Sequence, residues 1–216
     1  MNRFMLVSAA LLVGTSSFSA RAQTSMEERT TPSAEQTLIP SRFTNGGYGA
    51  PVQRFSSVAG KNVLFSGVEG GWIMNHQFIL GLAGYGMATQ NVRNSGTSLR
   101  DSKGRAPVVE MGYGGLLLGY TPQSMSLGHL AFQVVIGGGG FTYDVEDIAG
   151  VRQEDAPCDA FFVAEPSLQG EVNITRFLRI GVGGGYRFIS GASLDGLRDR
   201  DLRGASASLT FKLGHF

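Results

Sequence analysis

Cysteine is almost absent from this sequence of 216 residues, since Cys158 is the only one. A single cysteine excludes an internal disulfide, so the fold must be stable by other means. Charge is also scarce, because 16% of the residues are charged and the formal net charge is +1. No block of basic residues stands out, and this composition argues against a nucleic-acid partner. The mean hydropathy of +0.02 is typical neither of a strongly soluble chain nor of a helical membrane protein.

Glycine, by contrast, is abundant: the chain contains 32, about twice the usual share. These glycines follow no Gly-X-Y period, which excludes a collagen helix. They lie within apolar stretches, such as Val-Gly-Gly-Gly-Tyr at residues 182–186, unlike the glycines of disordered linkers. The run at residues 137–140 precedes neither a helical pattern nor a lysine, so it is not a phosphate-binding loop.

The first residues have the pattern of an export signal. Arg3 gives a positive start, residues 4–13 form an apolar run, and Ala20-Arg21-Ala22 matches an A-x-A cleavage signal. The apolar run is too short to span a bilayer as a helix. We predict that residues 1–22 are a signal peptide, cleaved after Ala22. The alternative is a buried N-terminal helix, but the order of the three parts favours the signal peptide.

The rest of the chain divides into a polar leader and a strand-rich region. Residues 23–41 contain Pro32 and Pro40 and show no periodicity, so we predict a flexible periplasmic leader. From residue 42 to 216, strand-like segments are separated by turn residues. They are longer than the usual soluble strand of about 5–6 residues and suit a membrane strand, which needs about 9–11. The eight predicted strands are 43–58, 61–74, 77–91, 105–121, 128–143, 159–173, 176–190 and 203–215.

Apolar and polar residues alternate most clearly in the later strands. In segment 176–190, Leu178, Ile180 and Val182 share one face, and Arg179 and Arg187 share the other. Segments 128–143, 159–173 and 203–215 alternate in the same way. Segments 61–74 and 77–91 are apolar on both faces, so their facing stays open. Segment 43–58 is the weakest strand prediction, because a proline at position 51 interrupts it.

The connections between the predicted strands alternate in length. Those near residues 75–76, 121–127 and 173–175 are short, whereas 91–104, 144–159 and 191–203 are long and charged. Outer-membrane barrels have short periplasmic turns and longer external loops. With eight strands, both ends of the region lie on the periplasmic side. The connection at Ala59-Gly60 departs from this rule, since it should be an outer loop and yet is short.

A period of two does not decide which face is outside. A soluble calyx would bury the apolar row, whereas a membrane barrel would expose it to lipid. The polar rows are mainly glycine and serine with few charges, whereas a soluble exterior would carry many more lysines and glutamates. The interior of an eight-stranded barrel is just wide enough for side chains to fill it, and small residues there leave room for long charged ones.

Aromatic residues gather near the ends of the predicted strands. Two such girdles are expected where a barrel meets the two bilayer interfaces, although aromatic residues are also common in ordinary strands. The predicted girdle residues are Trp72, Phe78, Tyr120, Phe141, Tyr143, Phe161, Phe162, Phe177, Tyr186 and Phe188.

The chain ends in Phe216, after the amphipathic segment Leu-Thr-Phe-Lys-Leu-Gly-His at residues 209–215. This ending resembles the outer-membrane barrel signature, and the region as a whole resembles the small OmpA- and OmpX-type barrels. The stretches 70–73 and 161–166 also resemble a family of uncharacterised outer-membrane barrels. The resemblance implies an all-β, eight-stranded, antiparallel up-and-down transmembrane β-barrel, with Phe216 as the assembly signal read by the barrel assembly machinery. Phe216 is out of phase with Phe211 and Leu213, which a bulge or a turned-in end would explain.

The polar faces carry nearly balanced charges. We predict that they form an ion-pair network that plugs the lumen, with Glu171 opposite Arg179 and Glu165 diagonal to Arg187, because an unpaired charge in a narrow lumen is costly. A narrow, gated ion path is the functional alternative to this structural filling. The predicted network consists of Glu69, Glu110, Glu165, Glu171, Arg179, Arg187 and Lys212.

The sequence offers no catalytic constellation. A hydrolase needs a nucleophile within reach of a base, but His76, His129 and His215 all fall at predicted periplasmic turns or at the C-terminus. None has the serine two residues on that resemblance to lipid A deacylase barrels would require. The acidic loop 144–159 could bind calcium weakly, but a solvated loop is the simpler interpretation. We predict no catalytic residues, no metal site and no cofactor.

The resulting hypothesis is a non-enzymatic, monomeric barrel in the outer membrane of a Gram-negative bacterium, with a structural or surface-interaction role. Its expected partners are outer-membrane lipid, lipopolysaccharide and the assembly machinery, and no nucleic acid. Basic residues in loop 91–105 are expected either to pair with the acidic loop 144–159 or to contact lipopolysaccharide phosphates. A lipid-modifying barrel enzyme, a small-solute channel and a soluble ligand-binding calyx are the alternatives. Architecture alone does not choose among them.

Overall fold

The computed structural model describes residues 44–89, 92–93, 106, 108–144, 158–193 and 198–216. The predicted signal peptide 1–22 and leader 23–41 lie outside these residues, as do most of loops 91–104 and 144–159, so those assignments stay predictions. Within the described residues, no helix is long and apolar enough to cross a membrane.

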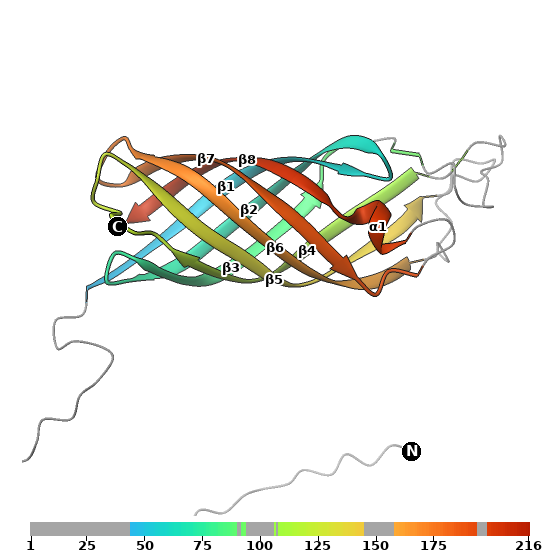
Figure 1. Ribbon diagram of the computed structural model, residues 1–216, viewed down its shortest axis with the longest axis horizontal. Helices are drawn as coiled ribbons and strands as arrows, with labels where there is room; N and C mark the ends of the chain where they lie inside the picture. The colour runs from blue at the N-terminus through green and yellow to red at the C-terminus, as the bar shows by residue number, and fades with distance from the viewer. Residues whose placement is uncertain (1–43, 90–91, 94–105, 107, 145–157, 194–197) are drawn as a thin grey trace, which may run out of the picture. The chain divides into compact units, whose positions relative to one another are not determined.

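The described residues form one closed antiparallel barrel in which each strand pairs with its neighbours in sequence and β1 pairs with β8 (Figure 1). This confirms the predicted fold class. The predicted strand bounds agree with the observed ones to within a few residues, and the largest difference is at the end of β3. The strands are β1 (Asn45–Val58), β2 (Lys61–Met74), β3 (Phe78–Met87), β4 (Val108–Tyr120), β5 (Gly128–Asp144), β6 (Cys158–Asn173), β7 (Leu178–Ser190) and β8 (Gly204–His215).

The two ends of the barrel differ. The C-terminus lies at the same end as the start of β1, whereas the short helix α1 (Asp199–Leu202) lies at the opposite end (Figure 1). We call the first the terminal end and the second the helix end. The compact connections after β2, β4 and β6 are all at the terminal end. Short turns at the end that holds the termini are typical of outer-membrane barrels.

The short connection between β1 and β2 is a two-residue turn at the helix end. Ala59 and Gly60 have φ values of 50° and 74°, as a type I′ hairpin turn requires at its two central residues. Glycine adopts this conformation without a steric penalty, whereas Ala59 adopts it at a steric cost from its Cβ atom. The Ala59 amide donates to the Asp201 carbonyl at 2.7 Å, so α1 covers the place where a longer loop was expected.

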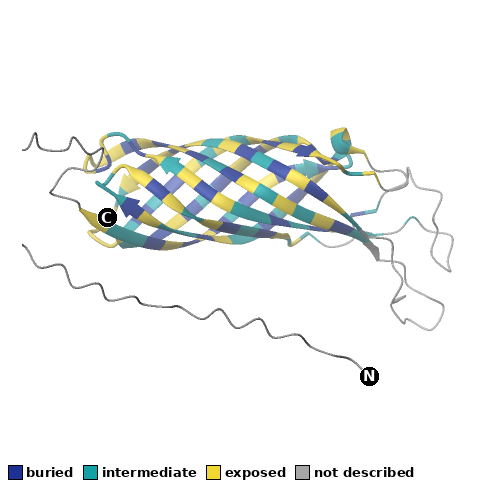
Figure 2. Cartoon of the chain, turned by 90° about the horizontal axis from the view of Figure 1, so that it is seen from below, coloured by how far each residue is buried: buried dark blue, intermediate teal, exposed yellow. Residues whose placement is uncertain are grey.

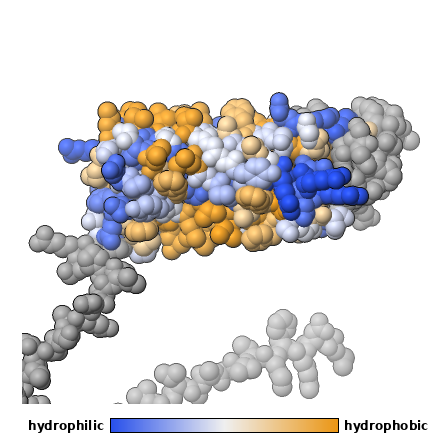
Figure 3. Space-filling model, in the orientation of Figure 1, coloured by the Kyte–Doolittle hydropathy of each residue, from blue (hydrophilic) through white to orange (hydrophobic). Residues whose placement is uncertain are grey.

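Burial alternates along every strand, and it decides which row faces outward (Figure 2). Val182 is 63% exposed, whereas Arg187 on the same strand is fully buried. The sequence did not decide which face of β2 and β3 points outward, but burial alternates in these strands too. Phe65 of β2 points inward, and Leu80 of β3 points outward. Apolar residues cover much of the outer surface between the two ends (Figure 3). An apolar exterior around a charged interior is the arrangement of a transmembrane barrel.

Two prolines lie within barrel strands without breaking them. Pro51 of β1 stays in register with Val68 of β2, but the β1–β8 ladder is interrupted between Gly49 and Val52. In the same way, Pro166 stays in register with β5 while the β6–β7 ladder is interrupted beside it. Proline has no amide hydrogen to donate, so each of these strands loses pairing on one side only. Segment 43–58, the weakest strand prediction, therefore does form a strand.

Inward glycines make room for large inward side chains. A Cβ atom on Gly139 of β5 would lie 2.5 Å from the Phe161 ring and 2.6 Å from Cβ of Tyr113. A Cβ atom on Gly67 of β2 would lie 2.3 Å from the Tyr85 ring. These distances are far below van der Waals contact, so the glycines permit tyrosine and phenylalanine inside so narrow a barrel.

The exposed apolar row leads to a direct test of the barrel's orientation. Leu82, near the middle of β3, is 69% exposed. Leu82→Arg places a cation in the hydrocarbon and should lower the free energy of unfolding in lipid vesicles by about 2–4 kcal/mol. Urea titration of the vesicle-inserted protein measures this change.

The control for this substitution is Gln77→Arg, at an exposed turn position at the terminal end, where the change should stay within about 0.5 kcal/mol. Equal effects of the two substitutions would mean that Leu82 faces water, and the transmembrane orientation would then be wrong.

Candidate functional site

The lumen is filled by charged side chains, and it is the candidate site. Four cations and three carboxylates are buried there, and all but Arg179 are at most 3% exposed. Among the predicted network residues, six point inward. Together with Arg54 they form the observed set: Glu69, Glu165, Glu171, Arg179, Arg187 and Lys212.

Arg54 of β1 lies at the centre of this set and bridges two carboxylates. Its Nη1 is 2.7 Å from Glu165 Oε2 of β6, and its Nη2 is 3.2 Å from Glu69 Oε1 of β2. β1 and β2 are neighbouring strands, whereas β6 is not a neighbour of either, so the Arg54–Glu165 pair runs across the lumen and the Arg54–Glu69 pair lies within the β1–β2 hairpin. One guanidinium therefore compensates two carboxylates in a place where water does not screen them.

Tyrosine and serine hydroxyls complete the coordination of these carboxylates. Tyr85 donates to Glu69 and accepts from Arg54 Nη2 at 2.9 Å. Tyr113 and Ser206 donate to Glu165 at 2.6 and 2.7 Å. The Arg54 guanidinium also lies 4.3 Å from the centre of the Tyr85 ring, a favourable cation–π distance. We call Arg54, Glu69, Tyr85, Tyr113 and Glu165 the central cluster.

A second cluster is centred on Glu171, which accepts from Lys212 Nζ at 2.5 Å and lies 3.3 Å from His129 Nε2. The Lys212 amine lies 4.9 Å from the centre of the Tyr48 ring. Glu171 and His129 are register partners on the neighbouring strands β6 and β5, whereas Lys212 comes from β8, on the other side of β7. His129 was predicted at a periplasmic turn. It is instead the second residue of β5, where the alternation points it inward.

The helix end of the lumen is closed by α1. Arg187 Nε donates to the Leu202 carbonyl at 3.0 Å, and Arg187 Nη2 donates to the Ser57 carbonyl at 2.9 Å. Leu202 itself is fully buried in the apolar cluster at this end. Arg203 Nε donates to the Ile189 carbonyl at 2.8 Å and holds the end of α1 against β7. A buried arginine thus fastens the helix over the lumen.

The terminal end is closed by Phe216. Its ring lies 6.4 Å from the Tyr48 ring, and the Arg179 guanidinium lies 3.9 Å from its centre. The terminal residue therefore turns inward, which explains why it is out of phase with the outward row of β8. The cavity beside it has a volume of about 10 Å³, the space of one water molecule.

Two predictions about the network are wrong. Glu110 of β4 is exposed, because the inward row of that strand is Val109, Met111 and Tyr113, and a period of two places Glu110 outside. Glu171 faces Gly181, and Arg179 faces Asn173, instead of each other. The β6–β7 hairpin is centred on residue 176 rather than on Thr175, and moving the centre by one residue shifts the register by two.

The predicted pair of Glu165 and Arg187 is also replaced by other contacts. Glu165 binds Arg54, and Arg187 binds backbone carbonyl groups at the helix end. The prediction considered only neighbouring strands, whereas a closed barrel brings strands from opposite sides together. Arg54 was missed because segment 43–58 was the weakest strand prediction, although Arg54 shares the inward row of β1 with Tyr48 and Val52.

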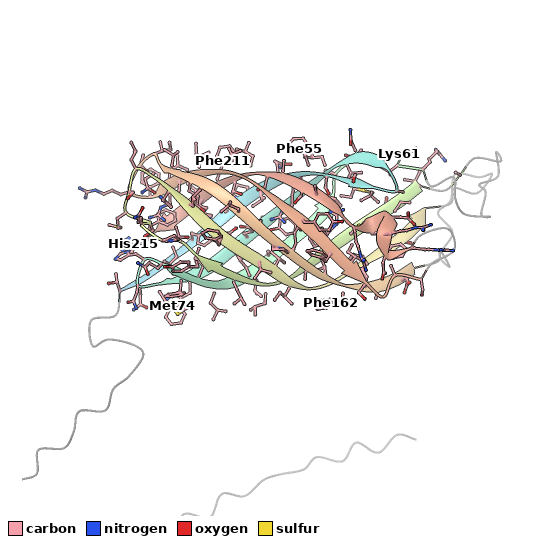
Figure 4. All side chains as sticks on the ribbon, in the orientation of Figure 1. Phe55, Lys61, Met74, Phe162, Phe211 and His215 are labelled. Carbon is pink, nitrogen blue, oxygen red and sulfur yellow. The ribbon has the colours of Figure 1, made fainter. Side chains whose placement is uncertain are left out.

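The aromatic residues divide between the exterior and the lumen. Phe141 and Phe161 were predicted in the girdles, but they are 2% and 5% exposed and stack on each other inside the barrel. The Tyr143 side chain lies outside the described residues. Phe55, Phe162 and Phe211 all point away from the barrel (Figure 4). Of these three, only Phe162 was a predicted girdle residue. The remaining predicted girdle residues that are exposed are Trp72, Phe78, Tyr120, Phe177, Tyr186 and Phe188.

The described residues contain no group of three or more His, Cys, Asp or Glu side chains arranged to hold a metal ion. His76 lies in the β2–β3 turn, and His215 is exposed at the end of β8. The polar partners of His129 are the Glu171 carboxylate and the Ser126 carbonyl. The chemistry of this arrangement is charge compensation.

Comparison with known proteins finds the same fold in solved structures. No protein-family model matches the sequence, and no curated protein matches it. The crystal structure of Neisserial surface protein A (NspA) aligns with a TM-score of 0.53 and 9% identity, over 80% of this chain and 98% of that one. Ail, the attachment invasion locus protein of Yersinia pestis, aligns with a TM-score of 0.46 and 10% identity, over 79% of this chain and 97% of that one. At this identity, the alignment with NspA shows the barrel fold alone.

The central cluster predicts a large effect of one substitution. Arg54→Leu leaves Glu69 and Glu165 buried without their shared cation, so the free energy of unfolding should fall by about 3–5 kcal/mol. Urea unfolding of the protein in lipid vesicles, followed by tryptophan fluorescence of Trp72, measures the loss.

The matched control is Arg200→Leu in α1. The Arg200 side chain is 73% exposed and lies 3.7 Å from Asp201, and exposed ion pairs contribute about 0–1 kcal/mol. A loss at Arg54 no larger than the loss at Arg200 would show that the lumen is hydrated and that the ion pairs across it are weak.

Proposed function

We propose that this small eight-stranded barrel resides in the outer membrane of a Gram-negative bacterium and has a structural or surface-interaction role without catalysis. The observation that carries this proposal is the filled lumen. Arg54, Glu69 and Glu165 meet across its centre, and Leu202 and Phe216 close its two ends. A barrel whose interior is occupied in this way has its outer surface and its rims available for interaction.

The charge balance of the interior supports a structural role. Four buried cations face three buried carboxylates. Removing one member of a buried pair is costly, whereas a fully paired set is compatible with a stable interior. The Arg54–Glu165 and Lys212–Glu171 pairs connect strands that are not neighbours, so they brace the barrel in directions that the strand ladders do not.

The helix end supports a role at the outer surface. Lys61 and Arg198 are exposed there, and the exposed Arg200 lies in α1, which the Ala59–Asp201 hydrogen bond joins to the β1–β2 turn. Exposed cations at the external rim suit charge-assisted contacts with lipopolysaccharide phosphates. The predicted contribution of loop 91–105 to such contacts concerns residues outside the described part of the chain.

The location has a simple test. The expressed protein should fractionate with outer membranes, resist carbonate extraction, and migrate differently on gels before and after heating, because a folded barrel stays compact in cold detergent. Release by carbonate together with unchanged migration would instead indicate a soluble calyx.

The filled lumen predicts electrical silence. In planar bilayers the inserted protein should give no discrete conductance steps, because buried side chains occupy the lumen and the cavity beside Phe216 has a volume of only about 10 Å³. Stable single-channel steps from protein of verified heat-modifiable migration would contradict the structural role and favour a small-solute channel.

A further inference from the structure

The outer face of β5, β6 and β7 carries an apolar groove at the terminal end. It has a volume of about 710 Å³, within the range of about 300–1,000 Å³ typical of small-molecule sites. The groove involves residues 128–130 and 170–172 of two paired strands, together with Ile174, Ile180 and Val182. Its exposed lining side chains, such as Leu130 and Val182, are on the outward side of the barrel, whereas His129 and Glu171 of the same lining are buried.

The groove is concave because glycines alternate with large apolar residues across the three strands. Gly170 of β6 lies between Leu130 of β5 and Val182 of β7 in the strand register. One step nearer the terminal end, Gly128 lies beside Val172, which in turn faces Ile180. Leu130 and Val182 are 51% and 63% exposed, so they stand as walls on either side of a floor made by backbone.

The glycine at the floor is not required by the packing of the barrel. A Cβ atom on Gly170 would meet only the Val182 carbonyl at 3.8 Å, and one on Gly128 would meet only the Glu171 carbonyl at 4.0 Å. These are ordinary contacts, unlike the clashes at the inward Gly139. The groove is therefore open space that a larger side chain would fill without forcing the strands apart.

The β6–β7 turn next to the groove carries an exposed cation. Ile174, which lines the groove, begins the β6–β7 turn, and the exposed Arg176 is two residues further on. Thr175 Oγ1 accepts from the Phe177 and Leu178 amides at 3.2 and 3.0 Å and fixes the turn that carries Arg176. The exposed ring of Phe177 lies beside it, as at a bilayer interface.

We propose that this groove binds one anionic phospholipid of the leaflet at the terminal end, with an acyl chain over Gly170 and the phosphate beside Arg176. The apolar walls suit a hydrocarbon chain, and a guanidinium suits a phosphate through charge-assisted hydrogen bonds. A phospholipid carries these two chemistries in the same order from the membrane interior to its surface. The inference rests on the proposed membrane location.

A second groove on the barrel lacks this combination. It lies at the helix end, has a volume of about 700 Å³, and is lined by the polar residues Ser57, Asn62 and Thr89 as well as by Phe55 and Leu64. Polar groups along a groove are poor partners for an acyl chain. The groove beside Gly170 is thus the better fit to a lipid tail.

Native mass spectrometry of the full barrel, refolded in detergent and titrated with phosphatidylglycerol or phosphatidylcholine, tests the proposal. The wild type should retain one phosphatidylglycerol molecule in preference to phosphatidylcholine. Gly170→Leu should abolish this retention by filling the floor of the groove. Arg176→Gln should weaken phosphatidylglycerol binding about fivefold and leave phosphatidylcholine unchanged, because one interfacial cation attracts anionic lipid by roughly this factor.

The matched control is Gly84→Leu, at an outward glycine of β3 where an added Cβ atom would meet nothing within 4 Å. It should retain lipid as the wild type does. Retention unchanged in both Gly170→Leu and Arg176→Gln overturns the proposal, as does equal loss in Gly84→Leu. Heat-modifiable migration of each variant reports insertion and folding separately, and Arg176→Gln, on an exposed turn, keeps the test open if Gly170→Leu does not fold.

Discussion

The structure depends on burying charges in a lumen too narrow to hydrate them. An eight-stranded barrel has room inside for side chains and little else, so each buried carboxylate must find a cation or a hydroxyl. Arg54 meets this requirement for Glu69 and Glu165 together, and Lys212 and His129 meet it for Glu171. The arrangement of the interior follows from this rule, including the tyrosines that donate to the carboxylates and the glycines that make space for those rings. A barrel with the same strands and unpaired charges would lose several kcal/mol for each one.

The exterior of the barrel is suited to hydrocarbon. Hydrocarbon replaces water around the strands, so the apolar row faces outward and the closed ladder leaves no strand edge unpaired. Side-chain size varies along this face. Glycines such as Gly170 lower the surface between Leu130 and Val182, and the result is a groove where a flat surface would offer lipid no particular site.

The two ends of the barrel are closed by different means. At the helix end a buried arginine binds the carbonyl of Leu202, so the closure is a hydrogen-bonded helix placed over apolar residues. At the terminal end the Phe216 ring packs between Tyr48 and the Arg179 guanidinium. Both closures use an arginine of β7, and this strand therefore links the interior network to each rim.

The sequence by itself determined the strands and their order, and for the last four strands it also determined which face points outward. The alternation of apolar and polar residues is a local pattern, so it can be found from neighbouring residues alone. It also identified six of the buried charges, since a charged residue on the polar face near the middle of an amphipathic membrane strand points into the interior. The tertiary structure alone decided which charges pair. Arg54 contacts Glu165 from a strand more than 100 positions away along the chain, and the β6–β7 register depends on where one turn is centred. It also decided that Glu110 faces outward and that Phe141 and Phe161 face inward, because near the rims apolar and polar residues occupy both faces. Closure of the barrel brings opposite walls within a side chain's reach, and no pattern along a single strand contains that distance.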